Sequence, residues 1–437
     1  MKLLFSFALP LMFANVFQQL YTVVDTAIVG RGVGMDALAA LGTVDWLNWL
    51  FLGIAQGYTQ GFSVRISQKF GQNDYPGMKR IAGQSAFMCV IIAVLGTVSG
   101  LLLLPLFLNM LRVPTELQGM AGLYVRILLA GFPAVVFFNY CSSLLRAIGN
   151  SKTPLLAMIV ASITNIVLDA ITVFVLRWGI VGAALATVVA QCLSGMVCAV
   201  RIYKTPLLHF RKKDFIPQKD ACRELFLLGT PVAAKNIVIA LGGMIVQSVV
   251  NGFSLSFIAG FTATNKLYGL LEIAATSYGY AVTTYVGQNF GAMKLDRVKR
   301  GMQAAVILSL VTAAVIAAVM ILFGREITML FISRENAALA LEAGNIAYLY
   351  LLAMSISLPI LYLLYVFQAG LQGMGQTMAT FISGMIELLL RVSLSLLVAY
   401  TGVQYGIFGA EVSAWWGASI YLTLSFLTKF RKARKNA

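Results

Sequence analysis

Residues 163–175 read ITNIVLDAITVFV, an apolar run of the kind that crosses a membrane as a helix. The run nevertheless contains Asn165 and Asp169, which are four residues apart and therefore lie on one face of a helix, one turn from each other. An ionisable side chain at the centre of a bilayer costs about 3 kcal/mol on insertion scales, so it persists where it faces a bundle interior, a water-filled path or a partner. A second such group, Asp25, lies in the first apolar run. We expect these two carboxylates to form one cation site.

The composition is that of a membrane protein. Of the 437 residues, 59% are hydrophobic and only 11% are charged, whereas soluble proteins carry about 25% charged residues. The mean hydropathy is +0.86. Pro10 and Asp25 interrupt the first apolar run, so we expect no cleavable signal sequence. The five cysteines form no C-x-x-C motif, which favours reduced packing residues over a metal or redox site.

Twelve apolar runs predict twelve membrane-spanning helices. Their limits are about 3–30, 37–63, 82–108, 121–144, 155–176, 180–202, 225–250, 256–285, 302–323, 344–368, 379–401 and 406–428. Lys and Arg concentrate in alternate connections, above all in the linker after the sixth run. The net charge of +16 therefore indicates orientation in a membrane rather than nucleic-acid binding, and it predicts that both termini are cytoplasmic.

The two halves of the chain resemble each other. Residues 145–150, LRAIGN, resemble residues 371–376, LQGMGQ, and Pro10 has a counterpart in Pro231. Because each half has an even number of spans, the halves are expected to be parallel repeats around a central cavity. We expect an all-α membrane protein built from two six-helix bundles. Its predicted parts are an amino-terminal lobe (1–203), a cytoplasmic linker (204–224), a carboxy-terminal lobe (225–428) and a basic cytoplasmic tail (429–437).

The first lobe carries the polar face that a cation site needs. Gln18, Tyr21 and Asp25 follow one another at helical spacing, and Pro10 can bend the helix before them because it lacks an N–H group. Two carboxylates in a dry bundle cannot both be ionised cheaply, so the pair can take a proton or a Na⁺ ion held by oxygen ligands. The alternative for Asp25 is a structural hydrogen bond to a neighbouring helix. The predicted coupling residues, which are also the candidate Na⁺ ligands, are Asp25, Asn165, Asp169 and Thr187.

The second lobe does not copy this site, because Arg391 occupies the position that corresponds to Asn165. Glu387 and Arg391 are four residues apart and are expected to neutralise each other. Lys266 is expected to pair with Glu272 or Glu411. The predicted substrate contacts are Gln18, Tyr21 and Glu272. The charges expected inside this lobe are Lys235, Lys266, Glu272, Glu387, Arg391 and Glu411.

Three motifs resemble a known family. Residues 10–30 follow the pattern P-L-x₆-Q-x-L-Y-x-x-V-D-x-x-I-V-G, residues 146–154 read RAIGNSKTP, and an F-G pair is followed nine positions later by K-R in both halves. The chain resembles the multidrug and toxic compound extrusion (MATE) transporters over nearly its whole length, with the bacterial DinF- or MepA-like branch the most similar. In that family the amino-terminal cation site uses an Asp on helix 1, an Asn and an Asp on helix 5 and a Thr on helix 6. Asp25, Asn165, Asp169 and Thr187 match these positions.

The resemblance implies a rocker-switch antiporter that exports small amphipathic organic cations in exchange for Na⁺ or H⁺. It also implies a monomer in the bacterial cytoplasmic (inner) membrane, with no organic cofactor and with Pro10 as a helix-bending residue. Lys235 together with Glu272 departs from the family pattern. The cations Lys235, Lys266 and Arg391 keep open a flippase for a lipid-linked or anionic amphipathic substrate. A membrane-embedded enzyme is not expected, because the sequence contains no H-E-x-x-H motif, nucleophile elbow or phosphate loop.

Overall fold

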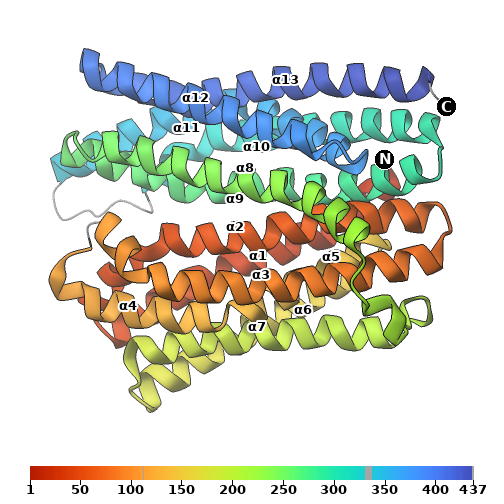
Figure 1. The fold of residues 1–437 in the computed structure, drawn as a ribbon. Helices are drawn as coiled ribbons and strands as arrows, with labels where there is room; N and C mark the ends of the chain where they lie inside the picture. Colours follow the sequence, from red (N-terminus) through yellow and green to blue (C-terminus); the bar gives the residue numbers. More distant parts are fainter. Residues whose placement is uncertain (112, 330–336, 436–437) are drawn as a thin grey trace. The chain divides into compact units, whose positions relative to one another are not determined.

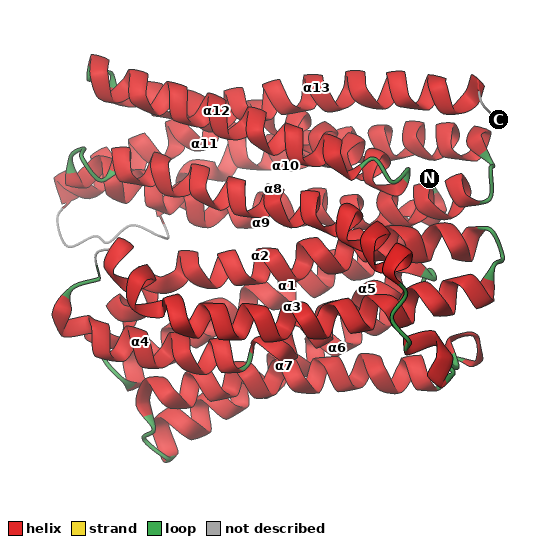
Figure 2. Ribbon diagram, in the orientation of Figure 1, coloured by secondary structure: helices red, strands yellow, loops and turns green. Residues whose placement is uncertain are grey.

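Helices make up nearly the whole chain. Backbone groups in a bilayer must be satisfied within the protein, and a helix satisfies them within a single segment. The computed structural model describes residues 1–111, 113–329 and 337–435, and in these ranges it contains helices and short connections but no strand (Figure 2). The prediction of an all-α membrane protein is therefore confirmed.

The chain divides into two compact units, of which the first comprises Leu9–Ala234. Its apolar side chains form two clusters, one around Phe62, Phe138 and Leu145, the other around Leu104 and Val125. Its helices (Figure 1) are most of α1 (Lys2–Gly32), then α2 (Met35–Gly71), α3 (Tyr75–Met110), α4 (Thr115–Ala130), α5 (Phe132–Ala147), α6 (Lys152–Asp169) with a π-helix at Ala170–Val175, and α7 (Gly179–Tyr203).

The second unit comprises Met1–Ala8 and Lys235–Ala437. Its helices are α8 (Lys219–Val250), whose first half belongs to the first unit, α9 (Leu255–Gly291), α10 (Leu295–Met329), α11 (Ala337–Gly373), α12 (Thr377–Thr401) and α13 (Phe408–Lys435) (Figure 1). Helix α11 packs against α9, α10 and α13, so it is the central helix of this unit.

Two of the predicted spans depart from a single straight helix. The predicted run 121–144 consists of α4 and α5, which are bent by 44° at Gly131. Pro133, at the start of α5, cannot donate a backbone hydrogen bond to the preceding helix. The predicted run 155–176 changes from α-helix to π-helix directly after Asp169.

Length and composition identify most of the spans in the described residues. Eight helices are long and apolar enough to cross a membrane, and the bent pair α4–α5 makes a ninth. Helices α2, α9 and α13 exceed the required length but are too polar to be identified in this way. With the bent pair taken as one span, the described helices correspond in order to the twelve predicted runs.

The chain passes between its two units next to two prolines. The first passage lies between Ala8 and Leu9, directly before Pro10, and the second lies between Ala234 and Lys235, one turn after Pro231. We expected the lobes to divide at the linker, at 203 and 225, whereas the first half of α8 groups with the first unit. Helix α1 continues through Pro10 as one helix. Each proline removes a backbone donor inside a helix that serves both units.

The sequence repeat is visible in the backbone. Asn73 (φ 58°), between α2 and α3, has a counterpart in Met293 (φ 56°), between α9 and α10. A left-handed conformation is uncommon for residues other than glycine, so its recurrence at matched positions marks the same turn. Gly149 (φ 92°) and Gly375 (φ 78°) form a second matched pair, each within a turn closed by equivalent backbone hydrogen bonds.

Candidate functional site

Helix α1 positions the first carboxylate. Asp25 is buried with 8% of its surface exposed, and its Oδ1 has no hydrogen-bond partner among the described residues. Tyr21 lies one turn earlier on the same face, with its hydroxyl beside Asp25 and the amide of Gln191. Gln18 is half-buried another turn away. The face predicted from spacing therefore points into the first unit at Asp25 and Tyr21.

Helix α6 brings the second carboxylate to the first. Asn165 and Asp169 are almost completely inaccessible, at 1% and 0% exposure. The carboxyl groups of Asp169 and Asp25 lie close enough to interact with each other. Asp169 is the last residue of α6, and the π-helix begins at the next residue. Single π-turns occur often at functional sites, and sequence periodicity gave no sign of this one.

Helix α7 contributes the remaining polar side chains of the cluster around Asp25 and Asp169. Asn165 donates from Nδ2 to Oγ1 of Thr187 at 3.4 Å, and Thr187 donates its own hydroxyl hydrogen to the carbonyl of Ala183 at 3.1 Å. Gln191 lies one turn beyond Thr187 and near Tyr21. We did not predict Gln191 as a site residue. Its position four residues after Thr187 in an apolar run was the available signal.

The cluster is rich in acceptors that lack donors. Both oxygens of Asp169, Oδ1 of Asp25 and Oδ1 of Asn165 are buried without a hydrogen-bond partner in the part of the chain that the structure describes. Leaving buried polar oxygens unpaired is costly, and leaving buried carboxylates uncompensated is more so. Such a set of oxygens can accept a proton or a small hard cation.

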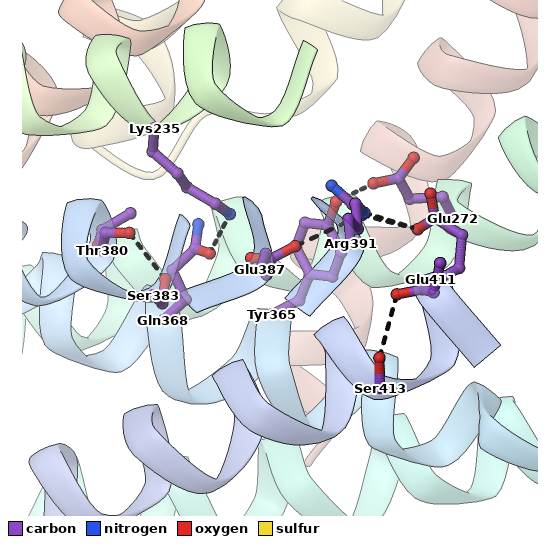
Figure 3. Close-up of polar contacts among 11 residues, drawn as sticks. Lys235, Glu272, Tyr365, Gln368, Thr380, Ser383, Glu387, Arg391, Glu411 and Ser413 are labelled. Carbon is purple, nitrogen blue, oxygen red and sulfur yellow. Dashed lines mark hydrogen bonds and ion pairs between the residues drawn. The ribbon is translucent and has the colours of Figure 1, made fainter. Parts of the chain in front are cut away.

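The second unit contains a different polar cluster (Figure 3). Arg391 of α12 donates from Nη2 and Nε to Oε2 of Glu411 of α13, at 2.7 and 3.1 Å. It lies 3.7 Å from Glu387, so the predicted pair of Glu387 and Arg391 is confirmed, although Glu411 is the closer partner. Arg391 and Glu387 are both buried. A buried arginine with two carboxylates is a structural ion pair that crosses from α12 to α13.

Lys235 and Glu272 have neutral partners in this cluster. Lys235 of α8 is 4% exposed and donates to Oε1 of Gln368, while Tyr365 donates its hydroxyl hydrogen to Glu272 (Figure 3). The side chain of Lys235 passes over Gly384, where an added Cβ would lie 2.8 Å from Lys235 Cγ. Among the described residues no carboxylate lies within ion-pair distance of Lys235.

The prediction for Lys266 was wrong. Lys266 is exposed on α9, and neither expected partner binds it, because Glu411 pairs with Arg391 and Glu272 accepts from Tyr365. A lysine at one position of an apolar run does not reveal which side of the helix is buried. Glu272 itself lies in the second unit, whereas Gln18, Tyr21, Asp25, Asn165, Asp169 and Thr187 all lie in the first.

Known proteins match the chain over most of its length. A family model described as MatE matches residues 10–171 and 231–397. The chain is 27% identical over 338 residues to the probable multidrug resistance protein YoeA of Bacillus subtilis (strain 168), covering 76% of this chain and 73% of YoeA. It is 23% identical over 412 residues to the multidrug export protein MepA of Staphylococcus haemolyticus, covering 94% of this chain and 90% of MepA.

A solved structure shares the fold. It is a transporter of the MOP superfamily from Pyrococcus furiosus, described as having a binding pocket of reversed polarity. The TM-score is 0.92 at 22% identity, and the match covers 99% of this chain and 96% of that one.

Proposed function

The chain belongs to the MatE family, and from this premise we propose that it is a secondary active antiporter that exports amphipathic organic cations in exchange for Na⁺ or H⁺. Members of this family are multi-pass membrane transporters rather than enzymes. The proposal assigns the coupling cation to Asp25 and Asp169, with Asn165 and Thr187 beside them.

The observation that carries the proposal is the set of donor-free buried oxygens in the first unit. Carboxylate and amide oxygens are the ligands that hard cations such as Na⁺ prefer, and the same carboxylates can hold a proton. Asp25 and Asp169 would carry the charge that balances the cation. Asn165 would add its Oδ1, and Thr187 would fix the direction of that amide. A bound cation would neutralise the pair, and its loss would leave a negative site that attracts a cationic substrate.

Coupling then follows from competition. If the ion and the organic cation bind the same negative cluster at different times, entry of one favours release of the other by alternating access. The membrane contributes about 2.3 kcal/mol per charge for each 100 mV, so an inward ion flow can drive substrate export. We propose a rocker-switch exchange of this kind, with Gln18, Tyr21 and Glu272 as substrate contacts.

The relatives and the charge pattern support a location. YoeA and MepA are bacterial proteins, and Lys and Arg alternate between the connections as expected for cytoplasmic termini. We propose a monomer in the bacterial cytoplasmic membrane, with both termini in the cytoplasm.

Ethidium efflux from cells that express the chain tests the proposal, with external Na⁺ and pH varied separately. We expect efflux that stops when the driving gradient is collapsed by an ionophore. Efflux equal to that of cells lacking the chain, under both gradients, would contradict export of organic cations.

Lys235 favours a second candidate function, transfer of a lipid-linked or anionic amphipathic substrate. Lys235 is deeply buried and its hydrogen-bond partner is a neutral amide, so an anionic substrate group would give it the counter-charge that the described residues do not supply. The Pyrococcus furiosus transporter, with its pocket of reversed polarity, has the same fold. Uptake of a fluorescent anionic amphiphile into proteoliposomes tests this function. Transport of the anion that is lost in Lys235→Met, with ethidium untransported, would favour it over export of cations.

A further inference from the structure

The linker between α7 and α8 is fixed to α3 by one side chain. Gln84 donates from Nε2 to the carbonyls of Asp214 and Ile216, at 3.1 and 2.7 Å, and its Oε1 accepts from the backbone N–H of Gln218 at 2.8 Å. The neighbouring Gly83 allows this approach, since an added Cβ would lie 2.1 Å from the carbonyl oxygen of Asp214. The linker is therefore packed against α3 as part of the first unit.

Residues of this docked linker contribute to the lining of an apolar cavity of about 940 Å³. Helices α3, α5 and α7 form the walls through side chains such as Val94, Phe137 and Tyr140, and the linker contributes Phe210 and Phe215. The volume is at the upper end of the range of about 300–1,000 Å³ that holds small-molecule ligands. Several wall residues, among them Val94 and Phe137, are exposed on the outer surface of the unit, where lipid surrounds a membrane protein.

Two exposed cations, Lys204 and Arg211, directly follow Tyr203 and Phe210, which line the cavity, and we refer to these two cations as its rim. Asp214 is the one acidic residue between positions 201 and 219, and it is buried where its carboxylate caps the backbone N–H of Arg211 at 2.7 Å. The cationic residues of this stretch are Arg201, Lys204, Arg211, Lys212, Lys213 and Lys219.

We propose that this cavity binds an anionic phospholipid, with an acyl chain between α3, α5 and α7 and the phosphate headgroup against Lys204 and Arg211. Basic clusters beside the cytoplasmic ends of spanning helices attract anionic lipids, each Lys or Arg contributing through charge. An amphipathic organic cation fits the walls but is repelled by the rim. A zwitterionic lipid fits the walls but gains little from the rim. A lipid in this position contacts both α3 and the linker that joins α7 to α8.

Lipid binding is measured on the purified full chain in detergent, by native mass spectrometry. Phosphatidylglycerol and phosphatidylcholine with identical acyl chains are titrated separately, and inorganic phosphate alone is the third arm. We expect tight binding of phosphatidylglycerol only. Lys204→Gln combined with Arg211→Gln should weaken that binding by about 25-fold, given roughly one tenfold step per 1.4 kcal/mol and about 1 kcal/mol per basic residue.

Matched variants distinguish the effects of the basic charges and of the cavity volume from a general loss of folding. The swap Lys204→Arg with Arg211→Lys keeps the charge and should keep the affinity, as should Arg431→Gln with Lys432→Gln in the tail. Ala86→Phe, which fills the cavity from α3, should abolish binding, whereas Val315→Phe at an exposed position of α10 should not.

Equal binding of the two lipids, displacement of the lipid by ethidium or by phosphate alone, or full affinity in Ala86→Phe would overturn the proposal. Assigning the lipid to the cytoplasmic leaflet depends on the proposed orientation of the chain in the membrane. The binding assay needs neither transport nor a membrane potential, so its failure is distinct from failure of the proposed antiport.

Discussion

Asn165 of α6 donates to Thr187 of α7 through its amide nitrogen, 3.4 Å from the hydroxyl oxygen. Thr187 has already given its own hydrogen to the carbonyl of Ala183, so its oxygen is available to accept. This contact fixes the orientation of the amide. The carbonyl end of Asn165 is left without a donor, one helical turn from the two unpaired oxygens of Asp169.

Thr187→Val should therefore weaken cation coupling without removing a charge. The variant leaves the amide nitrogen of Asn165 unpaired, and a buried group without its partner costs about 1–3 kcal/mol, enough to turn the amide around. We expect the concentration of Na⁺ or H⁺ that gives half-maximal efflux to rise by about tenfold. Thr187→Ser keeps the acceptor and should behave as wild type. The same dependence on the ion in Thr187→Val and Thr187→Ser would show that the contact plays no part in coupling.

The ion pairs of Arg391 give a prediction for stability. Arg391→Met leaves Glu387 and Glu411 facing each other without a cation, and loss of one partner from a buried pair costs about 3–5 kcal/mol. Adding Glu411→Gln to Arg391→Met should recover part of that loss, because one unpaired carboxylate is then removed. Thermal unfolding in detergent, followed for the two single variants and the double variant, measures the coupling. Strictly additive losses would contradict the pairing.

Glu272 should influence which compounds are exported. Its carboxylate accepts from Tyr365 in the second unit and lies in a cluster that also contains Lys235. Glu272→Gln removes a negative charge and should lower ethidium export about tenfold relative to an uncharged dye, as expected from roughly 1.4 kcal/mol of lost attraction. Glu326→Gln, an exposed carboxylate on α10, is the matched control. An unchanged ratio of the two dyes in Glu272→Gln would reduce the residue to a structural contact.

The turn between α2 and α3 carries a pH-dependent contact outside the spanning helices. Asp74 accepts from Lys69 Nζ at 2.8 Å and from the backbone N–H of Gly77 at 2.9 Å, and these hydrogen bonds hold the pKa of Asp74 below its ordinary value. A carboxylate with a lowered pKa in the folded state stabilises the fold above its unfolded pKa of about 3.9, and this contribution is lost as the pH falls through the folded value.

Asp74→Asn keeps a capping oxygen but loses the charge. We expect it to destabilise the protein by about 0.5 kcal/mol at pH 7, as for other surface ion pairs, and to approach wild type well below pH 4. Lys69→Met should give a similar loss at pH 7. Unfolding midpoints at the two pH values measure the effect. If the difference in midpoint between wild type and Asp74→Asn grew as the pH fell, the stabilising role of the Asp74 carboxylate would be contradicted.

The features of this molecule that depend on local spacing could be predicted from the sequence. The separation of Asn165 from Asp169 predicts one helix face, and both side chains are buried on it together with the carboxylate of Asp25. The repeat predicted from residues 145–150 and 371–376 recurs as matched turns at Gly149 and Gly375. Both predictions needed only the helical period and a comparison of the two halves.

The remaining features depend on contacts between distant residues. Pairing of Arg391 with Glu411 requires knowledge of which helices are neighbours, and periodicity supplied only the partner four residues away. Gln84 holds a linker 130 to 132 positions later in the sequence, through contacts to backbone carbonyls that have no sequence signature. The change to a π-helix after Asp169 also has no sign in the composition, because Ala170–Val175 consists of Thr172 and five ordinary apolar residues.

The central claim is that Asp25 and Asp169 together hold the coupling cation. Proteoliposomes loaded with ethidium, with an imposed Na⁺ or pH gradient, test it most directly when wild type is compared with Asp25→Asn, Asp169→Asn and the exposed control Asp296→Asn. We predict that wild type and Asp296→Asn export ethidium under one of the two gradients. Asp25→Asn and Asp169→Asn, when folded and reconstituted to the same level, should export ethidium only at the rate that wild type shows without a gradient. Gradient-driven export at the wild-type rate in both Asp25→Asn and Asp169→Asn would contradict the account.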